Sequence, residues 1–176
     1  MRHLTDDLTV LDLPRPDQSQ ADYKRALSCF ATGVTVVTTR WEGADWGMTC
    51  NSFASVSLEP RLVLWSIRRA ASSLDAFTRS GRFSVSVLST NQQGLARQFA
   101  TGDMASRFIG VEVNRQKNQC LRLSDAVAFF DCELHELVPA GDHLILIGHV
   151  SDFGWQDKSV LGFCQSAFGQ FMPLPA

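Results

Sequence analysis

The chain has 176 residues, a formal net charge of -2, and a composition that is 45% hydrophobic and 19% charged. These values predict one water-soluble globular domain with a substantial core. Because lysine and arginine do not cluster, the charge gives no support to nucleic acid or an anionic membrane as a partner. No apolar run approaches the roughly 18 residues of a membrane-spanning helix. The N-terminus also lacks the layout of a signal peptide, so we expect a cytoplasmic protein.

The cysteines favour the same compartment. Five of them are widely spaced and none forms a C-x-x-C pair, so neither a disulfide framework nor a zinc site is predicted. We expect most of them to be small buried hydrophobic residues.

The chain is predicted to begin with an arm and a helix. Residues 1–20 show little periodic hydrophobicity and are interpreted as a flexible arm, which leaves 21–176 as the folded domain. Apolar residues recur at helical spacing from Tyr23 to Phe30 and predict a helix that packs on a sheet. Gly33 is expected at the C-terminal cap of this helix.

A predicted strand and turn lead into a polar stretch, WGMTCNSFASVSLEP, at 46–60. Residues 34–40 are almost all β-branched and predict the strand, and 42–45 supply the turn. The polar stretch is rich in small residues, whose short side chains let backbone groups approach a ligand closely. Two interpretations stay open for it, a wall against a flat polar ligand or a polar edge strand.

Two further strands and a helix are predicted in the middle of the chain. Alternation after the polar stretch puts Val63, Trp65 and Ile67 on one face of a strand. Residues 83–88 alternate in the same way and predict a half-buried strand, and 90–101 predict a helix.

A short helix between those two strands could bind a phosphate. Ser72 and Asp75 have the spacing of a capping box, and Gly81 ends the helix. The start of a helix presents free N–H groups and the positive end of a dipole, which attract anions. The sequence alone still favours the simpler interpretation that Ser72 caps its own helix. Further on, a loop carries Arg107, and 111–119 is expected to be an exposed excursion.

The last third contains the clearest antiparallel signal. Residues 127–137 and 143–150 are strand-like runs joined by a loop that contains Pro and Gly. His143 and His149 share a face of the second run but lie on the order of 20 Å apart, so they cannot bind one metal ion together. With six or more strands and two or three helices, we predict a mainly β fold. It would be an antiparallel, closed or partly split β-barrel with peripheral helices.

Few residues could carry out difficult chemistry unaided. The sequence contains no G-x-G-x-x-G, P-loop or G-x-S-x-G motif and no zinc spacing. A chain of this kind is suited to binding a cofactor that supplies the reactive group.

Three blocks at compatible spacing carry a resemblance to a known family. They are FATGVTVVTT at 30–39, GMTCNSFASVSLEP at 47–60, and GDHLILIGHV at 141–150. From about Tyr23 to Phe168, the chain resembles the flavin reductase-like, FMN-binding split-barrel proteins. This family includes the reductase components of two-component flavin-dependent monooxygenases.

The resemblance implies an NAD(P)H-dependent flavin reductase that transfers hydride from NADH or NADPH to FMN or FAD. It also implies a homodimer and a separate monooxygenase that receives the reduced flavin. His143 would be the catalytic residue facing the nicotinamide, and Ser72, Ser73 and Arg107 would hold the flavin phosphate. The complete flavin site would comprise Met48, Thr49, Cys50, Asn51, Ser52, Ser66, Ile67, Ser72, Ser73, Arg107 and Phe168. No metal ligand is implied.

Alternatives and departures from the family pattern remain. The chain could instead be an electron-transfer protein with tightly bound FMN that does not oxidise NAD(P)H, or an interaction module without flavin. Cys50 stands where the family usually has Ala or Ser, and the bulk of Trp65 is expected to affect flavin preference or the contact between subunits. Because 163–168 lacks the basic residue and the Tyr often found there, the choice between NADH and NADPH stays open.

Overall fold

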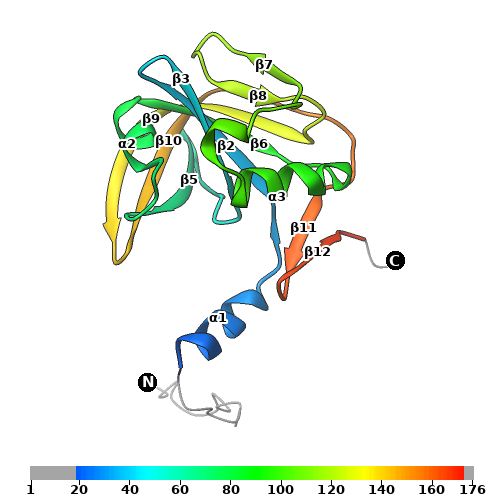
Figure 1. Ribbon diagram of the computed structural model, residues 1–176. Coiled ribbons are helices and arrows are strands. Elements are labelled where there is room, and N and C mark those ends of the chain that lie inside the picture. Colours follow the sequence, from blue (N-terminus) through cyan, green and yellow to red (C-terminus); the bar gives the residue numbers. More distant parts are fainter. Residues whose placement is uncertain (1–18, 173–176) are drawn as a thin grey trace, which may run out of the picture.

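The computed structural model describes residues 19–172 (Figure 1). The predicted arm at 1–20 therefore lies outside the described residues, apart from Ser19 and Gln20, which cap and begin the first helix. In chain order the elements are α1 Gln20–Ser28, β1 Thr32–Gly33, β2 Thr35–Trp41, β3 Ala44–Cys50, β4 Ala54–Leu58, β5 Arg61–Arg68, α2 Leu74–Arg79, β6 Arg82–Val87, the 3-10 turn η1 Thr90–Gln92, α3 Gln93–Thr101, the 3-10 turn η2 Met104–Ser106, β7 Val113–Arg115, β8 Leu121–Leu123, β9 Ala128–Ala140, β10 His143–Trp155, β11 Leu161–Cys164 and β12 Ala167–Gln170.

Seven strands form one antiparallel sheet in the order β3-β2-β6-β9-β10-β5-β4. The sheet coils around a shared core, because residues of β2, β3, β5, β6, β9 and β10 all enter the same buried cluster. Its two edge strands, β3 and β4, follow each other along the chain and are not paired in the described sheet. The predicted mainly β, antiparallel split barrel is confirmed, and its split lies between β3 and β4.

The centre of the core is Trp65. Its indole ring is fully buried and makes edge-on contacts with Phe77 of α2 at 4.9 Å and Phe83 of β6 at 5.8 Å, measured between ring centroids. Such geometry is favoured by the charge distribution of aromatic rings. Because its side chain does not reach the surface, the expectation that Trp65 takes part in a subunit contact is wrong, and its expected effect on flavin preference stays a prediction.

Helix α3 covers the outer face of β2 and β3 through a second cluster. Phe99 of α3 is fully buried and packs edge-on against Phe108, with ring centroids 5.0 Å apart. Gly47 of β3 allows this approach, because a Cβ at that position would lie only 2.7 Å from Phe99 Cε1.

Strand β6 is buried on both faces, and the prediction of a half-buried strand was wrong. Ser84 and Ser86 are both fully buried, and Ser84 Oγ donates a hydrogen bond to Asp131 at 2.7 Å. The cover is the β7–β8 hairpin, whose Leu123 N–H donates to Ser86 Oγ at 3.1 Å. The segment expected as an exposed excursion therefore belongs in part to a hairpin that closes the outer face of β6.

An ion cluster lies beneath that hairpin. Arg122 of β8 binds the buried Asp131 through two hydrogen bonds, at 3.1 Å and 2.6 Å, and also pairs with Asp152 of β10. The Arg122 guanidinium lies 3.4 Å from the ring centroid of Phe129. Burial opposes the charge on Arg122, but the hydrogen bonds that it donates to the Asp131 and Asp152 carboxylates outweigh this effect and raise the pKa of the guanidinium.

Helix α1 was expected to pack on a sheet, but it is largely exposed. Figure 1 shows it standing away from the barrel, and none of its residues is buried. Tyr23, Leu27 and Phe30 are 66%, 56% and 78% exposed. The apolar spacing did predict a helix, but the apolar side chains stay exposed, and the C-terminal end of α1 meets the β11–β12 turn, where the Gln165 N–H donates to the Ser28 carbonyl oxygen at 2.7 Å. The expected Gly33 cap was also wrong, because the helix ends at Ser28 with Cys29 as its cap.

The capping box predicted at Ser72 and Asp75 is absent. The residue before α2 is Ser73, whose ψ of 1° lies outside the extended region that caps require, and its side chain makes no capping hydrogen bond. A capping box occurs instead at Ser19, with Asp22, and at Ser89 the Gln92 side chain accepts from the Ser89 N–H at 3.1 Å while the Ser89 hydroxyl makes no capping bond. None of the helices within residues 19–172 is long and apolar enough to cross a membrane.

The Arg122 cluster gives a testable prediction for stability. Replacing Arg122 by Met leaves the Asp131 carboxylate buried without a cation, which we expect to lower the free energy of unfolding by about 3–5 kcal/mol. Arg122→Met combined with Asp131→Asn should recover most of that loss. Urea unfolding of the two single variants and the double variant measures the coupling.

A surface ion pair provides the control for this cycle. Arg79 and Asp75 are 68% and 61% exposed, so Arg79→Ala should change stability by roughly 0.5 kcal/mol or less. An Arg122→Met variant as stable as this control would contradict the prediction.

Candidate functional site

One serine side chain bridges the split between β3 and β4. Residues 51–53 connect the two strands, and Ser52 Oγ accepts a hydrogen bond from the Ser66 backbone N–H at 2.9 Å. The same hydroxyl lies 3.4 Å from the Ser66 carbonyl oxygen and 3.1 Å from Cys50 Sγ. The connector is therefore fastened to β5 at the split, where each edge strand leaves one side of its backbone without a strand partner.

The polar stretch at 46–60 divides into two parts. The edge-strand interpretation fits one part, and the ligand-wall interpretation fits the other. Strand β4, Ala54–Leu58, is an edge strand with four of its five residues exposed. The end of β3 and the connector 51–53 form the candidate wall for a flat ligand. Asn51 and Ser52 are exposed there.

The side chains of Met48, Thr49 and Cys50 in this wall make their contacts within the protein. Thr49 Oγ1 donates to the Ala96 carbonyl oxygen of α3 at 2.6 Å. Met48 packs against the core, and Ser73 Oγ contacts its sulfur at 3.8 Å. Cys50 is only 7% exposed and is part of the core. A ligand at the wall would therefore meet Asn51, Ser52 and backbone groups more than these side chains.

The tip of the β9–β10 hairpin is held against the end of β5. The Arg69 backbone N–H donates to the Asp142 carbonyl oxygen at 2.9 Å, and Arg69 Nε donates to the Gly141 carbonyl oxygen at 3.1 Å. His143 is paired with Arg68 in the β5–β10 ladder. Ser66, which binds Ser52, and Arg68, which pairs with His143, both belong to β5. Strand β5 therefore connects Ser52 and His143 rigidly.

The imidazole of His143 has a fixed partner on one side. Its Nδ1 lies 2.8 Å from Asp142 Oδ1, and its side chain is 35% exposed. The hydrogen bond with His143 lowers the pKa of Asp142, so this carboxyl stays ionised to more acidic pH than an isolated aspartate. The pair orients the ring and leaves Nε2 available to a ligand.

A pocket of about 390 Å³ opens on the α3 side of the wall. This volume is within the range of small-molecule sites. It brings together Thr49, Cys50, Asn51 and Phe168 from the predicted set. The remaining lining residues come from the link between β1 and β2, from α3 and from β11, and they are Val34, Ala96, Arg97, Ala100, Thr101 and Phe163.

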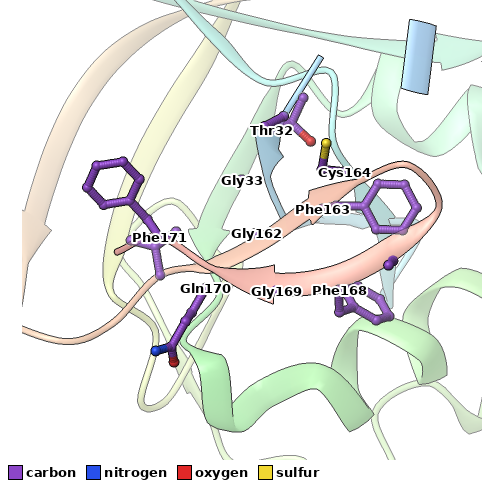
Figure 2. A pocket seen from close by; sticks show the side chains of 12 residues that line it. Thr32, Gly33, Gly162, Phe163, Cys164, Phe168, Gly169, Gln170 and Phe171 are labelled. Carbon is purple, nitrogen blue, oxygen red and sulfur yellow. The ribbon is translucent and has the colours of Figure 1, made fainter. Parts of the chain in front are cut away.

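Phe168 also borders a second, apolar pocket of about 450 Å³ along the β11–β12 hairpin (Figure 2). Phe163 and Phe168 lie at one end of this hairpin, with ring centroids 5.4 Å apart, and Phe171 lies at the other end. Phe168 is the only residue of the predicted flavin set among those lining this pocket.

The prediction for Ile67 was wrong as far as its side chain is concerned. Ile67 is 1% exposed and points into the core. The alternation of β5 places the Ser66 side chain on the opposite face. The Ser66 backbone N–H donates to Ser52 Oγ. Only the Ile67 backbone could border a ligand.

The three residues predicted to bind a phosphate are not equally available. Ser72 is exposed, whereas Ser73 is buried against Met48. Arg107 donates from Nε to the Gly102 carbonyl oxygen at 2.9 Å and from Nη1 to the Gly47 carbonyl oxygen at 2.6 Å. Burial lowers the pKa of Arg107. Arg107 therefore fastens β3 to the segment after α3, and among its donors Nη2 has no partner in the described residues.

The sequence patterns did not identify three arginine side chains near the site. Arg68 and Arg69 follow the buried part of β5 and precede Ser72, and this position after a strand was a signal that could have been used. Arg97 lines the 390 Å³ pocket. No feature of the sequence distinguished Arg97 from an ordinary solvated charge on a helix.

The chain matches known proteins over most of its length. Residues 27–172 match the model of the flavin reductase like domain. The chain is 37% identical over 154 residues to "FMN reductase (NADH) SmoA" of Agrobacterium fabrum, which covers 88% of this chain and 87% of that protein. The chain is also 36% identical over 148 residues to "Flavin-dependent trigonelline monooxygenase, reductase component" of Acinetobacter baylyi, which covers 84% of this chain. It spans about half the length of some curated relatives, 47% in this case.

A solved structure supports the same assignment. "Streptomyces globisporus C-1027 NADH:FAD oxidoreductase SgcE6" superposes with a TM-score of 0.85 at 33% identity, over 90% of this chain and 96% of that chain. The same oxidoreductase has also been solved in complex with NAD and FAD fragments. The sheet order, the wall at 48–52 and the Gly-Asp-His hairpin are thus found in a chain that belongs to the flavin reductase family.

Proposed function

We propose that this chain is an NAD(P)H-dependent flavin reductase that transfers hydride from NADH or NADPH to FMN or FAD. The observation that carries the proposal is the hydrogen bond between Ser52 and Ser66, which connects the ligand wall to the strand that pairs with His143. The names of the relatives support it, since one is an NADH-dependent FMN reductase and another is an NADH:FAD oxidoreductase.

The residues of the chain would bind and orient the reactants. A bound flavin would supply the hydride acceptor, which no side chain can provide. The backbone of 49–52 would contact the flavin ring system, and Ser72 with the neighbouring Arg68 and Arg69 would bind its phosphate. His143, oriented by Asp142, would contact the nicotinamide nucleotide through Nε2 and hold it against the flavin, because hydride transfer requires the two rings in contact.

We further propose that the reduced flavin passes to a separate monooxygenase. The name of the trigonelline monooxygenase relative supports this role for a reductase component.

Anaerobic stopped-flow absorbance tests the reductase activity. Mixing the protein and FMN or FAD with NADH or NADPH should bleach the flavin absorbance in a reaction that requires the protein. If neither nucleotide bleaches the flavin while FMN remains bound through gel filtration, the electron-transfer alternative replaces the proposal.

His143 has a matched control on its own strand. His143→Ala should slow flavin reduction roughly tenfold or more, because the nucleotide loses a positioning contact, while the Kd for flavin stays within a few fold. His149 is exposed on the same face of β10 and forms no ion pair with an aspartate among residues 19–172. His149→Ala should therefore reduce flavin at the wild-type rate. Equal rates for both variants would remove His143 from the mechanism.

We also propose a homodimer in which α1 packs against a second copy of the chain. Exposed apolar side chains on α1 and just after its cap support it, since Tyr23 and Leu27 of α1 and the following Phe30 would be left in water by a monomer.

Sedimentation measures this assembly directly. Leu27→Ser combined with Phe30→Ser should shift the protein towards the monomer, because the substitutions remove apolar area from the proposed interface. Lys24→Ser, also exposed on α1, should leave the assembly unchanged. A double variant that sediments as the wild type would contradict a role of α1 in the dimer.

A further inference from the structure

Two cysteines outside the core meet where α1 reaches the β11–β12 hairpin. Cys29 caps α1 and is exposed, and Cys164 ends β11 and is half-buried (Figure 2). The Gln165 N–H donates to the Ser28 carbonyl oxygen and holds the two segments together. Cys164 Sγ lies 3.7 Å from that oxygen and 3.8 Å from the Cys29 carbonyl oxygen. Two thiols 135 positions apart in the chain are thus neighbours.

Rotation of one side chain would bring the two sulfurs together. By standard backbone bond lengths, Cys164 Sγ lies no more than about 6 Å from the Cys29 Cα. Cys29 Sγ now faces the Arg25 carbonyl oxygen at 3.5 Å, so it must turn about its Cα–Cβ bond to reach Cys164. A disulfide also needs a specific separation of the two Cα atoms. Because α1 has no buried residue, little packing opposes the small shift that this separation requires.

The other three thiols are protected from oxidants. Cys50, Cys120 and Cys132 are all buried. Burial raises the pKa of Cys120 to about 12 and also raises the pKa of Cys132. The thiolate is the form of cysteine that oxidants attack, and access decides which thiolate they meet. An oxidant in water would therefore meet Cys29 first.

We propose that Cys29 and Cys164 form a reversible disulfide that fastens α1 to the β11–β12 hairpin, with hydrogen peroxide as the oxidant. The Cys29 thiolate attacks one peroxide oxygen, so that an S–O bond forms, the O–O bond breaks, and the departing hydroxide takes a proton to become water. The Cys164 thiolate then attacks the sulfenic sulfur, the S–S bond forms, and the S–O bond breaks with release of a second water. Two thiols are oxidised and one peroxide is reduced.

The source of peroxide is the one link that rests on the proposed function. Reduced flavin that meets dioxygen instead of a monooxygenase is reoxidised and produces hydrogen peroxide. The disulfide would then form where reduced flavin is made faster than it is used. Since Phe163 and Phe168 of the fastened hairpin line the 390 Å³ pocket, the bond would also restrain one wall of that pocket.

The proposed homodimer leaves Cys29 reachable. Cys29 has helical backbone angles. At roughly 100° of rotation per residue, its side chain therefore lies about 120° or more around the helix axis from Tyr23 and Leu27. It faces away from the apolar side chains that the dimer would bury.

Tryptic peptide mapping tests the disulfide. The reduced protein is treated with hydrogen peroxide, the remaining thiols are alkylated in denaturant, and the digest is analysed by mass spectrometry. Peptides 26–40 and 159–176 contain Cys29 and Cys164 as their only cysteines. We expect them to appear as one cross-linked species lacking two hydrogens, with near-complete loss of both free peptides. Dithiothreitol should restore the free peptides.

Matched variants identify the partners. Cys29→Ser and Cys164→Ser should each prevent the cross-link, whereas Cys50→Ala removes a buried thiol and should leave it unchanged. The inference is overturned if both peptides are recovered uncross-linked after peroxide treatment, or if Cys29 is oxidised to sulfinic acid without a cross-link. On non-reducing electrophoresis the product should migrate as one chain. Migration as two chains would overturn the assignment within one chain.

Hydrogen exchange tests the fastening of α1. Exchange of the 20–28 amides should slow in the oxidised wild type and should not change in peroxide-treated Cys164→Ser. Equal exchange in the reduced and oxidised wild type would overturn the fastening. Because peroxide is added as a reagent, absence of NAD(P)H oxidation would overturn the proposed function and leave the cross-link as expected.

Discussion

The Ser52 hydroxyl is the contact on which the candidate site depends. The seven-stranded sheet ends in β3 on one side and β4 on the other, and the split between them is crossed by the hydrogen bond from the Ser66 N–H to Ser52. This bond fixes the connector 51–53 relative to β5, and β5 fixes the hairpin that carries His143 through the ladder and the Arg69 contacts. A barrel that closed by pairing β3 with β4 would leave no split at which the proposed flavin could bind.

Strand periodicity and turn residues predicted most of the fold. Alternation in β5 identified Val63, Trp65 and Ile67 as one face, and all three are buried. The errors arose where burial depends on distant segments. Ser84 and Ser86 alternate with apolar residues as solvent-facing residues would. They are buried because the β7–β8 hairpin covers them, and Asp131 and Leu123 provide their hydrogen-bond partners. The spacing in α1 was correct, but it says nothing about which surface covers the helix.

The sequence pointed to the segments that form the candidate site but not to the directions of their side chains. The resemblance pointed to the stretch 48–52 and to the Gly-Asp-His turn, and the structure connects the two through β5. The resemblance could not show that the side chains of Met48, Thr49 and Cys50 point into the protein. It also could not show that Arg107 donates two hydrogen bonds to backbone carbonyl oxygens. Cys50, a departure from the family pattern, is a core residue whose sulfur meets Ser52.

Gly47 determines how close α3 lies to the sheet, and so how wide the pocket beside Arg97 is. With no side chain at this position, Phe99 packs directly on the backbone of β3. A methyl group would lie 2.7 Å from the Phe99 ring and push the helix outward, together with Ala96, Arg97 and Ala100. A residue outside the lining of this pocket therefore sets the width of the pocket, through the thickness of the layer behind it.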